Sequence, residues 1–259
     1  MDLGLQGKKA IVCASSRGLG KACATALVRE GCDVTINGRT EKTLNAAKAE
    51  MQALSCGSVT AVLADINTVE GRDLLLAASP EADILVNNNE GPPPGAFQQW
   101  GVEEWQAALD ANLLAPVFMI KAVIEGMKER RFGRIVNITS AMVKSPLGAM
   151  GLSTAARSGL TALSKGLSKE AAAFNVTLNN LLPERFDTDR QKQMADLAVA
   201  FKGITYEEAR AEITETVAAK RFGTPAEFGD ACAFLCSAQA GFISGQNLQM
   251  DGGSYAGLM

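Results

Sequence analysis

A pair of glycines near the N-terminus has the spacing of a phosphate-binding turn. Gly18 and Gly20 follow the short apolar run 8–14 and lie at the start of a helical pattern that ends at Gly31. Glycines at such a point let the backbone approach a pyrophosphate, which the positive N-terminus of the helix attracts. A glycine pair between a strand and a helix therefore predicts a dinucleotide site. The alternative is a tight turn that binds nothing.

Two arginines indicate which dinucleotide would bind. The second apolar run, 33–37, ends at Asn37, Gly38 and Arg39, without the acidic side chain that usually accepts from the ribose 2′-hydroxyl of NAD. Arg39 and Arg17 instead offer planar guanidinium groups, which suit a 2′-phosphate dianion. We therefore predict NADP in preference to NAD, unless one of these arginines is only a solvated surface charge.

The stretch 137–160 combines a strand end, a polar turn and the start of a helix. The apolar run 135–138 breaks at Thr139 and Ser140, and a new helix begins near Gly151 after a loop. In a nucleotide-binding α/β enzyme, a hydride would meet its substrate in a turn of this kind. We therefore expect the reacting centre in this stretch.

Strand-like and helical segments alternate along the chain. We expect strands at 8–14, 33–37, 59–63, 83–86, 134–138, 176–182 and 247–250. Helices are expected after Gly20, over 41–54, after Thr68, over 102–130 with a bend near Pro116, over 151–174 and from Pro225. This alternation predicts an α/β fold: one Rossmann-like domain over 1–259, with a doubly wound parallel sheet of about seven strands and helices on both faces. Residues 187–221, which include the capping-box pattern of Thr205 and Glu208, are interpreted as a helical lid over the site.

Composition argues against several kinds of protein. The net charge of −3 disfavours a broad nucleic-acid surface, and the absence of histidine disfavours Ser-His-Asp hydrolysis and most zinc sites. No unbroken run of about 18 apolar residues and no signal-peptide pattern occur, so we expect a cytoplasmic protein without a membrane span. No metal site is predicted. The cysteines lie in apolar contexts and are interpreted as reduced packing residues: Cys13, Cys23, Cys32, Cys56, Cys232 and Cys236.

From nearly end to end, the sequence resembles the short-chain dehydrogenase/reductase family. The family's glycine-rich loop matches residues 13–20, and its adenine-contacting aspartate matches Asp65. Its Asn-Asn-Ala-Gly motif matches Asn87–Glu90, its helix asparagine matches Asn112, and its catalytic serine matches Ser140. The resemblance implies an NADP(H)-dependent oxidoreductase that acts on a small carbonyl or alcohol.

The resemblance also implies a set of site residues. Catalytic roles are implied for Asn112, Ser140, Ser153 and Arg157. Cofactor binding is implied for Ala14, Ser16, Arg17, Gly18, Leu19, Gly20, Asn37, Arg39, Thr40, Asp65, Ile66, Asn88, Asn89, Glu90, Arg157, Pro183, Glu184, Phe186 and Thr188.

The catalytic helix departs from the family pattern. The family has a tyrosine 13 residues after the serine and a lysine four residues later, where this chain has Ser153 and Arg157. In the family, the tyrosine protonates the substrate oxygen, and the lysine lowers the tyrosine pKa and binds the nicotinamide ribose. A serine hydroxyl is far less acidic than a phenol. Arg157 can still bind the ribose, but it keeps its proton at neutral pH.

Other departures affect the cofactor groove and the proton donor. We expect the extra methyl group of Ala14 to be tolerated, and Glu90 either to repel a polyanionic cofactor or to point to solvent. Three residues are alternative proton donors: Lys144 in the loop after the catalytic serine, Tyr206 in the lid and Tyr255 near the C-terminus. For each of them, an ordinary surface or packing role is the competing interpretation.

Three functions follow from these observations. The first is an NADP-dependent oxidoreductase that works with Ser140, Lys144 and Arg157. The second is a non-catalytic NADP-binding sensor or oligomer subunit. The third is a cofactor-free enzyme like the halohydrin dehalogenases, which have an arginine at the lysine position but keep the tyrosine and rebuild the nucleotide loop, the reverse of this chain. The resemblance further implies a homotetramer or dimer formed through 102–130 and 151–174, a small-molecule substrate, and no nucleic-acid or membrane partner.

Overall fold

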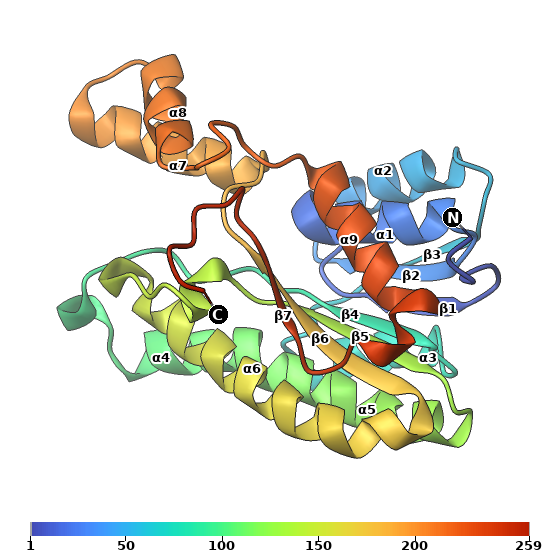
Figure 1. Ribbon diagram of the computed structural model, residues 1–259. Coiled ribbons are helices and arrows are strands. Elements are labelled where there is room, and N and C mark those ends of the chain that lie inside the picture. The colour runs from blue at the N-terminus through green and yellow to red at the C-terminus, as the bar shows by residue number, and fades with distance from the viewer. Residues whose placement is uncertain (1, 259) are drawn as a thin grey trace.

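The protein is built around one parallel sheet of seven strands (Figure 1). The computed structural model describes residues 2–258. The strand order is β3-β2-β1-β4-β5-β6-β7, and every neighbouring pair is parallel. The predicted doubly wound sheet is therefore confirmed. Its strands are β1 (Lys9–Val12), β2 (Asp33–Gly38), β3 (Val59–Leu63), β4 (Ile84–Asn87), β5 (Gly133–Ile138), β6 (Val176–Pro183) and β7 (Asn247–Met250).

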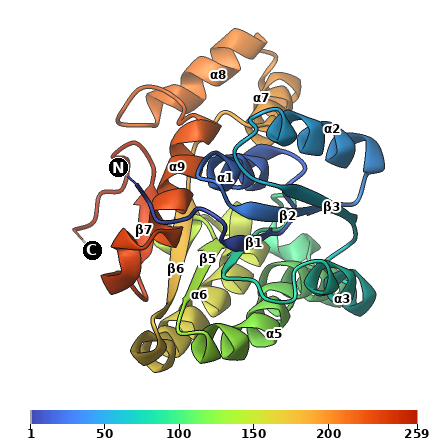
Figure 2. The same cartoon turned by 90° about the vertical axis from the view of Figure 1, so that its right-hand side faces the viewer.

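Helices cover both faces of this sheet (Figures 1 and 2). One face carries α1 (Gly18–Arg29), α2 (Glu41–Gln52) and α9 (Pro225–Cys236), and the other carries α3 (Val69–Ala77), α5 (Ala115–Glu129) and α6 (Gly151–Ala171). Neighbouring residues of β1 divide between the two cores, with Val12 in the first and Ile11 in the second. Because the central strands are buried on both faces, β1 and β4 are mainly apolar runs without alternation, which is why the sequence revealed them.

The winding of the chain reverses between β1 and β4. From β1 the chain moves outward to β2 and β3, then returns to β4 beside β1 and moves outward in the other direction. The loops that follow β1 and β4 therefore diverge and leave a crevice at the carboxyl ends of these strands, where ligands bind in open α/β sheets. The sheet places the predicted nucleotide turn, residues 13–20, beside this crevice.

A row of asparagines crosses four strands of the sheet. Asn87, Asn137, Asn180 and Asn247 are successive register partners from β4 to β7. Asn87 Nδ2 donates to Asn137 Oδ1 at 2.9 Å, and Asn137 Nδ2 donates to Asn180 Oδ1 at 3.0 Å. Asn180 Nδ2 donates to Asn247 Oδ1 at 2.8 Å, and Asn137 also donates to Ser164 Oγ of α6 at 2.9 Å. Since a shifted register would leave the buried amides of Asn87, Asn137 and Asn180 unpaired, the row fixes the strand alignment beneath the crevice.

The helical stretch 102–130 is irregular just before Pro116. A π-helical turn at Asp110–Leu114 joins α4 (Val102–Leu109) to α5. Pro116 follows two residues after this turn, inside a helix that is continuous over Val102–Glu129. A proline inside a helix lacks the N–H that would pair with a carbonyl of the preceding turn, so an irregularity is expected there. The irregularity near Pro116 is the wider turn that carries Asn112.

The same stretch is apolar enough to cross a membrane by length and composition alone. An 18-residue window within Val102–Glu129 has a mean hydropathy of 1.7. The expectation of no membrane span was based on the absence of an unbroken apolar run, a criterion that does not detect a window of high mean hydropathy. In α5 the side chains of Met119, Ile120 and Met127 are buried in the core beneath the sheet. This packing accounts for the composition of the helix.

Two further helices lie outside the layers of the sheet. α7 (Asp189–Lys202) and α8 (Tyr206–Glu215) form a hairpin beyond the carboxyl end of β6 (Figure 1). Thr205 Oγ1 accepts from the Glu208 N–H at 3.2 Å, and the Glu208 carboxylate accepts from the Thr205 N–H at 2.8 Å. The predicted capping box is therefore confirmed. That the hairpin acts as a lid stays a prediction.

The cysteines are free thiols, and all but one are buried. Burial raises the pKa of the Cys13 thiol to about 12, so this side chain stays neutral at ordinary pH. Cys56 is exposed beyond α2, so its interpretation as a packing residue is wrong.

The turn after β1 holds an alanine in a left-handed conformation. Ala14 has a φ of +44°. Its N–H donates to Asn37 Oδ1 at 2.7 Å, and its carbonyl oxygen accepts from Asn88 Nδ2 at 3.0 Å. For a residue with a Cβ atom, this conformation costs about 1–2 kcal/mol. The methyl group of Ala14 is thus accommodated at the expense of backbone strain.

The asparagine row predicts a large loss of stability when its central member is removed. Asn137→Ala leaves the buried Asn87 Nδ2 and Asn180 Oδ1 without their partners, so we expect the free energy of unfolding to fall by about 2–4 kcal/mol. Urea denaturation followed by circular dichroism measures this change. Asn45→Ala, on the exposed face of α2, is the matched control and should change stability by less than about 0.5 kcal/mol. Equal losses in the two variants would contradict the structural role of the row.

The strained turn predicts that Ala14→Gly stabilises the protein. Glycine adopts positive φ without a Cβ penalty, and part of this gain is offset by its greater freedom in the unfolded chain. We expect a net gain of about 0.5–1 kcal/mol in thermal or urea unfolding. The same substitution at Ala49, on the exposed face of α2, should instead cost about 1 kcal/mol. Destabilisation at both positions would show that Ala14 carries no strain.

Candidate functional site

A cleft of about 560 Å³ opens at the carboxyl ends of the central strands. Its walls come from the turn after β1, the ends of β2 and β3, the loops after β4 and β5, the first turns of α6, and the segment from the end of β6 into α7. The predicted site residues found on its wall are Ala14, Ser16, Arg17, Gly18, Leu19, Asn37, Arg39, Thr40, Asp65, Ile66, Asn88, Asn89, Glu90, Ser140, Ser153, Arg157, Pro183, Glu184, Phe186 and Thr188.

Three predicted residues do not line this cleft. A Cβ atom on Gly20 would lie 2.5 Å from the Ala14 carbonyl oxygen and 2.6 Å from Asn88 Nδ2, so this glycine allows α1 to pack tightly against the turn. Asn112 is buried on the π-helical turn and donates to the Glu90 carbonyl oxygen at 3.3 Å. Lys144 points elsewhere, with its Nζ atom 5.4 Å from the centre of the Tyr255 ring.

The other two candidate proton donors are also absent from the wall of the cleft. Tyr206 lies at the start of α8, where the Arg210 guanidinium is 5.9 Å from the centre of its ring. Tyr255 follows β7 and contacts Lys144. The prediction that Lys144, Tyr206 or Tyr255 supplies the proton therefore finds no support in the geometry of the cleft.

The turn at the start of α1 is suited to an anion. Gly18 has a φ of +58°, and the first turn of α1 contains no acidic residue. Arg17, at the N-cap position, is exposed and lines the cleft. Free backbone N–H groups and the positive end of the helix dipole both favour a phosphate here.

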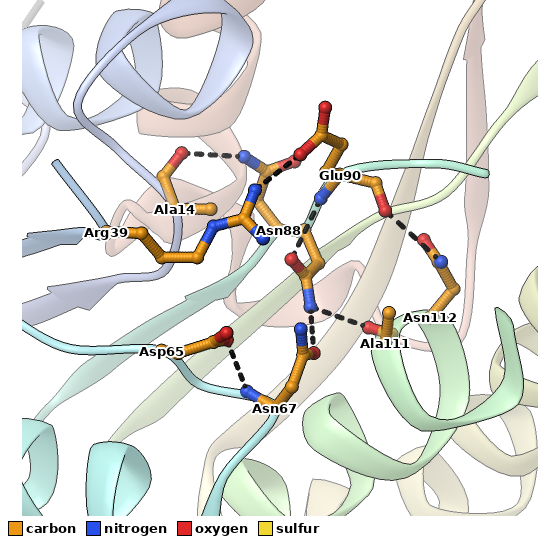
Figure 3. Close-up of polar contacts among 9 residues, drawn as sticks. Ala14, Arg39, Asp65, Asn67, Asn88, Glu90, Ala111 and Asn112 are labelled. Atoms are coloured by element: carbon orange, nitrogen blue, oxygen red, sulfur yellow. Dashed lines mark hydrogen bonds and ion pairs between the residues drawn. The ribbon is translucent and has the colours of Figure 1, made fainter. Parts of the chain in front are cut away.

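The far end of the cleft is a tightly bonded set of loop residues (Figure 3). Asp65 Oδ1 accepts from the Asn67 N–H at 3.0 Å, which shapes the turn after β3. Asn89 Nδ2 donates to Asn67 Oδ1 at 2.8 Å and to the Ala111 carbonyl oxygen at 3.0 Å. The loop after β4 is thereby tied to the turn after β3 and to the π-helical turn. This end of the cleft is consequently preformed rather than loose.

An ion pair crosses this end of the cleft. Arg39 Nη2, after β2, lies 2.5 Å from Glu90 Oε2, in the loop after β4 (Figure 3). Both side chains are more than half exposed. The Glu90 carboxylate is largely exposed but has a cationic partner within the site, and its repulsion of a polyanionic cofactor stays a prediction.

Ser140, Ser153 and Arg157 come together at the opposite end. Arg157 is 8% exposed; its Nε donates to Ser153 Oγ at 3.1 Å and its Nη1 donates to the Ile138 carbonyl oxygen at 2.7 Å. No carboxylate of the described residues pairs with it, and desolvation lowers the pKa of the guanidinium to about 10, so it remains a cation at neutral pH. Ser140 Oγ accepts from the Met142 N–H at 3.2 Å.

The electrostatic character of this end follows from these bonds. Both serine oxygens accept a hydrogen bond from a nitrogen, which leaves each hydroxyl proton free to donate into the cleft. Gly91 adds space beside them, since a Cβ atom there would lie 3.5 Å from Arg157 Nη2 and 4.0 Å from Ser153 Oγ. Two hydroxyl groups and a buried cation therefore lie on the wall of the same cleft.

Several residues on the wall of the cleft were not predicted. They come from the loops after β4 and β5 and from the segment around the start of α7. These segments contain no motif of fixed spacing from which a functional residue could be predicted. Their apolar members resemble ordinary packing residues in sequence, and only the interpretation of 187–221 as a lid pointed toward part of this set. The unpredicted lining residues include Gly91, Pro92, Met142, Leu147, Met150, Arg185, Gln191 and Met194.

The chain is similar to proteins of known family over almost its whole length. A family model described as Enoyl-(Acyl carrier protein) reductase matches residues 13–255. The "Uncharacterized oxidoreductase YvaG" of Bacillus subtilis (strain 168) is 32% identical over 258 residues, which cover 98% of each chain. The 3-oxoacyl-[acyl-carrier-protein] reductase FabG of Escherichia coli (strain K12) is 30% identical over 253 residues, 98% of this chain and 99% of FabG.

A solved structure shows the same similarity. L-Sorbose reductase from Gluconobacter frateurii, complexed with NADPH and L-sorbose, superposes with a TM-score of 0.94 at 27% identity and covers 100% of both chains. The parallel sheet, the nucleotide turn at its point of reversal and this match over almost the whole length lead to one conclusion. The chain belongs to the short-chain dehydrogenase/reductase family.

Proposed function

We propose that this protein is an NADP(H)-dependent oxidoreductase that interconverts a small carbonyl compound and its alcohol. The observation that carries the proposal is one cleft in which a phosphate-suited turn, Arg39 and the Ser140–Ser153–Arg157 group all lie on the wall. Such a cleft accommodates a dinucleotide along its length. Relatives that are named reductases, and a similar structure complexed with NADPH, support the same function.

The residues present fit this cofactor. The N-terminal turn of α1 would hold the pyrophosphate, and Arg39 would hold the 2′-phosphate. Asp65, which keeps one carboxylate oxygen beyond its bond to the Asn67 N–H, would accept a hydrogen bond from the adenine. The nicotinamide end would then lie toward Ser140 and Ser153, with Arg157 in contact with its ribose. The cofactor supplies the hydride when it is bound.

The substrate oxygen would be activated by side chains of this chain. Hydride addition to a carbonyl carbon leaves negative charge on the oxygen, and the Ser140 and Ser153 hydroxyls would donate hydrogen bonds to it. The buried cation of Arg157 would stabilise the same charge, more strongly than an exposed one because the site is desolvated. Among the described residues neither of the family-type donors, a phenol or a lysine, lines the cleft, so the proton that completes the alcohol would come from water.

A second candidate is a non-catalytic NADP-binding protein, either a sensor or an oligomer subunit. One observation favours it: Ser153 is 4% exposed with its hydroxyl bonded to Arg157, and among the described residues no phenol takes the place of the missing proton donor on the cleft wall. The two candidates differ in turnover but share cofactor binding. Purified protein that binds NADPH but never oxidises it with a broad carbonyl panel would favour the second.

A lid, an oligomeric state and a cellular location are also proposed. We propose that α7 and α8 close over bound ligands as a lid. A homotetramer or dimer through α4–α5 and α6 and a cytoplasmic location are proposed from the family resemblance. Analytical ultracentrifugation tests the oligomer, and a single species of 27.2 kDa, the mass of one chain, would overturn it.

The proposed role of Ser140 predicts a selective loss of turnover. Ser140→Ala removes one donor to the developing negative charge, so kcat/KM for NADPH-dependent carbonyl reduction should fall by roughly 10²-fold or more. The dissociation constant for NADPH should stay within about twofold, because the hydroxyl acts on the reacting oxygen. Ser145→Ala, at an exposed position outside the cleft, should leave both values unchanged. An active Ser140→Ala variant with wild-type kinetics would contradict this role.

The missing phenol predicts a gain of function. Ser153→Tyr together with Arg157→Lys restores the family's proton donor and its cationic partner, so we expect faster carbonyl reduction than in the wild type. The single variant Arg157→Lys is the control, because it changes the cation without adding the phenol. Stopped-flow measurement of NADPH oxidation compares the variants. No gain in a folded double variant that still binds NADPH would show that proton donation does not limit the reaction.

A further inference from the structure

The Arg39–Glu90 ion pair lies where a 2′-phosphate would bind. Arg39 follows β2, and Glu90 reaches it from the loop on the other side of the cleft (Figure 3). Both residues line the cleft. The carboxylate of Glu90 therefore occupies a face of the same guanidinium that a phosphate dianion would use.

The backbone of Glu90 is held in place by neighbouring loops. Its N–H donates to Asn89 Oδ1 at 2.9 Å, and its carbonyl oxygen accepts from Asn112 Nδ2 at 3.3 Å. Asn89 is itself bonded to Asn67 and to the Ala111 carbonyl oxygen. These bonds hold the backbone of Glu90 in the cleft, so rotation of an exposed side chain is enough to separate its carboxylate from Arg39.

We propose that Glu90 is an internal competitor for the 2′-phosphate and thereby sets how strongly the site prefers NADP(H) to NAD(H). When a 2′-phosphate binds, Arg39 exchanges the carboxylate for the phosphate, and Glu90 turns toward solvent. A dinucleotide without this phosphate leaves the ion pair intact. The inference rests on the proposed cofactor but not on catalysis.

The solvent exposure of the Arg39–Glu90 ion pair determines how strongly Glu90 lowers the affinity for the 2′-phosphate. The side chains of Arg39 and Glu90 are 54% and 60% exposed, and exposed ion pairs are weak enough for a doubly charged phosphate to displace. The carboxylate therefore reduces the affinity for the 2′-phosphate without abolishing it. Removal of its charge should strengthen binding by about three- to tenfold, given the usual strength of such pairs plus the lost repulsion between carboxylate and phosphate.

Two nucleotide fragments test the proposal without any need for turnover. Isothermal titration calorimetry compares 2′,5′-ADP, which carries the phosphate, with 5′-AMP, which lacks it. Glu90→Gln should bind 2′,5′-ADP about three- to tenfold more tightly than the wild type and bind 5′-AMP within about twofold of it. Glu129→Gln removes the same charge from the exposed end of α5, outside the cleft, and should change neither affinity.

A double-mutant cycle with Arg39 and Glu90 distinguishes competition for Arg39 from general repulsion between the Glu90 carboxylate and the phosphate. Arg39→Gln should weaken binding of 2′,5′-ADP, and in that background Glu90→Gln should bring a much smaller gain. The same gain in both backgrounds would overturn the proposal, as would unchanged or weaker binding of 2′,5′-ADP by the single variant Glu90→Gln. Because both side chains are exposed, these variants should fold, and thermal unfolding verifies it.

The outcome is distinguishable from that of the proposed function. A Glu90 effect on fragment binding in a protein that never oxidises NADPH supports the competitor and contradicts the oxidoreductase. Turnover of NADPH with no effect of Glu90→Gln on fragment binding supports the oxidoreductase and contradicts the competitor. Failure of the wild type and every variant to bind either fragment contradicts both.

Discussion

The reversal of strand order between β1 and β4 is the constraint on which the site depends. It separates the loops after these strands and opens the cleft at their carboxyl ends. Parallel pairing is also what sends every strand end to the same edge of the sheet. The asparagine row from Asn87 to Asn247 fixes the register of β4 to β7. The ends of β4, β5 and β6 are therefore fixed relative to one another, and so are the residues that follow them into the cleft. As a result, the predicted nucleotide turn and the two serines, Ser140 and Ser153, lie on the wall of one cleft, where a single long ligand would contact both.

Two charges give the ends of this cleft different properties. At one end Arg157 is buried, without a carboxylate partner, and its electrostatic influence on a ligand oxygen is large. At the other end Arg39 is exposed and already paired with Glu90, so its influence is moderated. The proposed chemistry thus relies on a cation that burial strengthens, whereas cofactor preference relies on one that a neighbour weakens. Neither property follows from the presence of an arginine alone.

Patterns in the sequence predict most of the fold, because strands buried on both faces read as unbroken apolar runs and the glycine turn sits between two such signals. In 102–130 the sequence indicated an irregularity near Pro116 but not its form, since a π-helical turn such as Asp110–Leu114 has no comparable signature. Most predicted site residues in fixed motifs at strand ends line the cleft. Lys144 does not line it, because its side chain packs against Tyr255. The partner of Glu90, which lies 51 positions away in the chain, was not anticipated.

The most direct test of this account is a crystal structure of the protein grown with NADPH. The account predicts the pyrophosphate at the N-terminus of α1, the 2′-phosphate on Arg39 with Glu90 turned away, and the nicotinamide ring beside Ser140 and Ser153 with Arg157 on its ribose. A nucleotide bound outside the cleft, or in the cleft with its nicotinamide end at Arg39, would contradict the account.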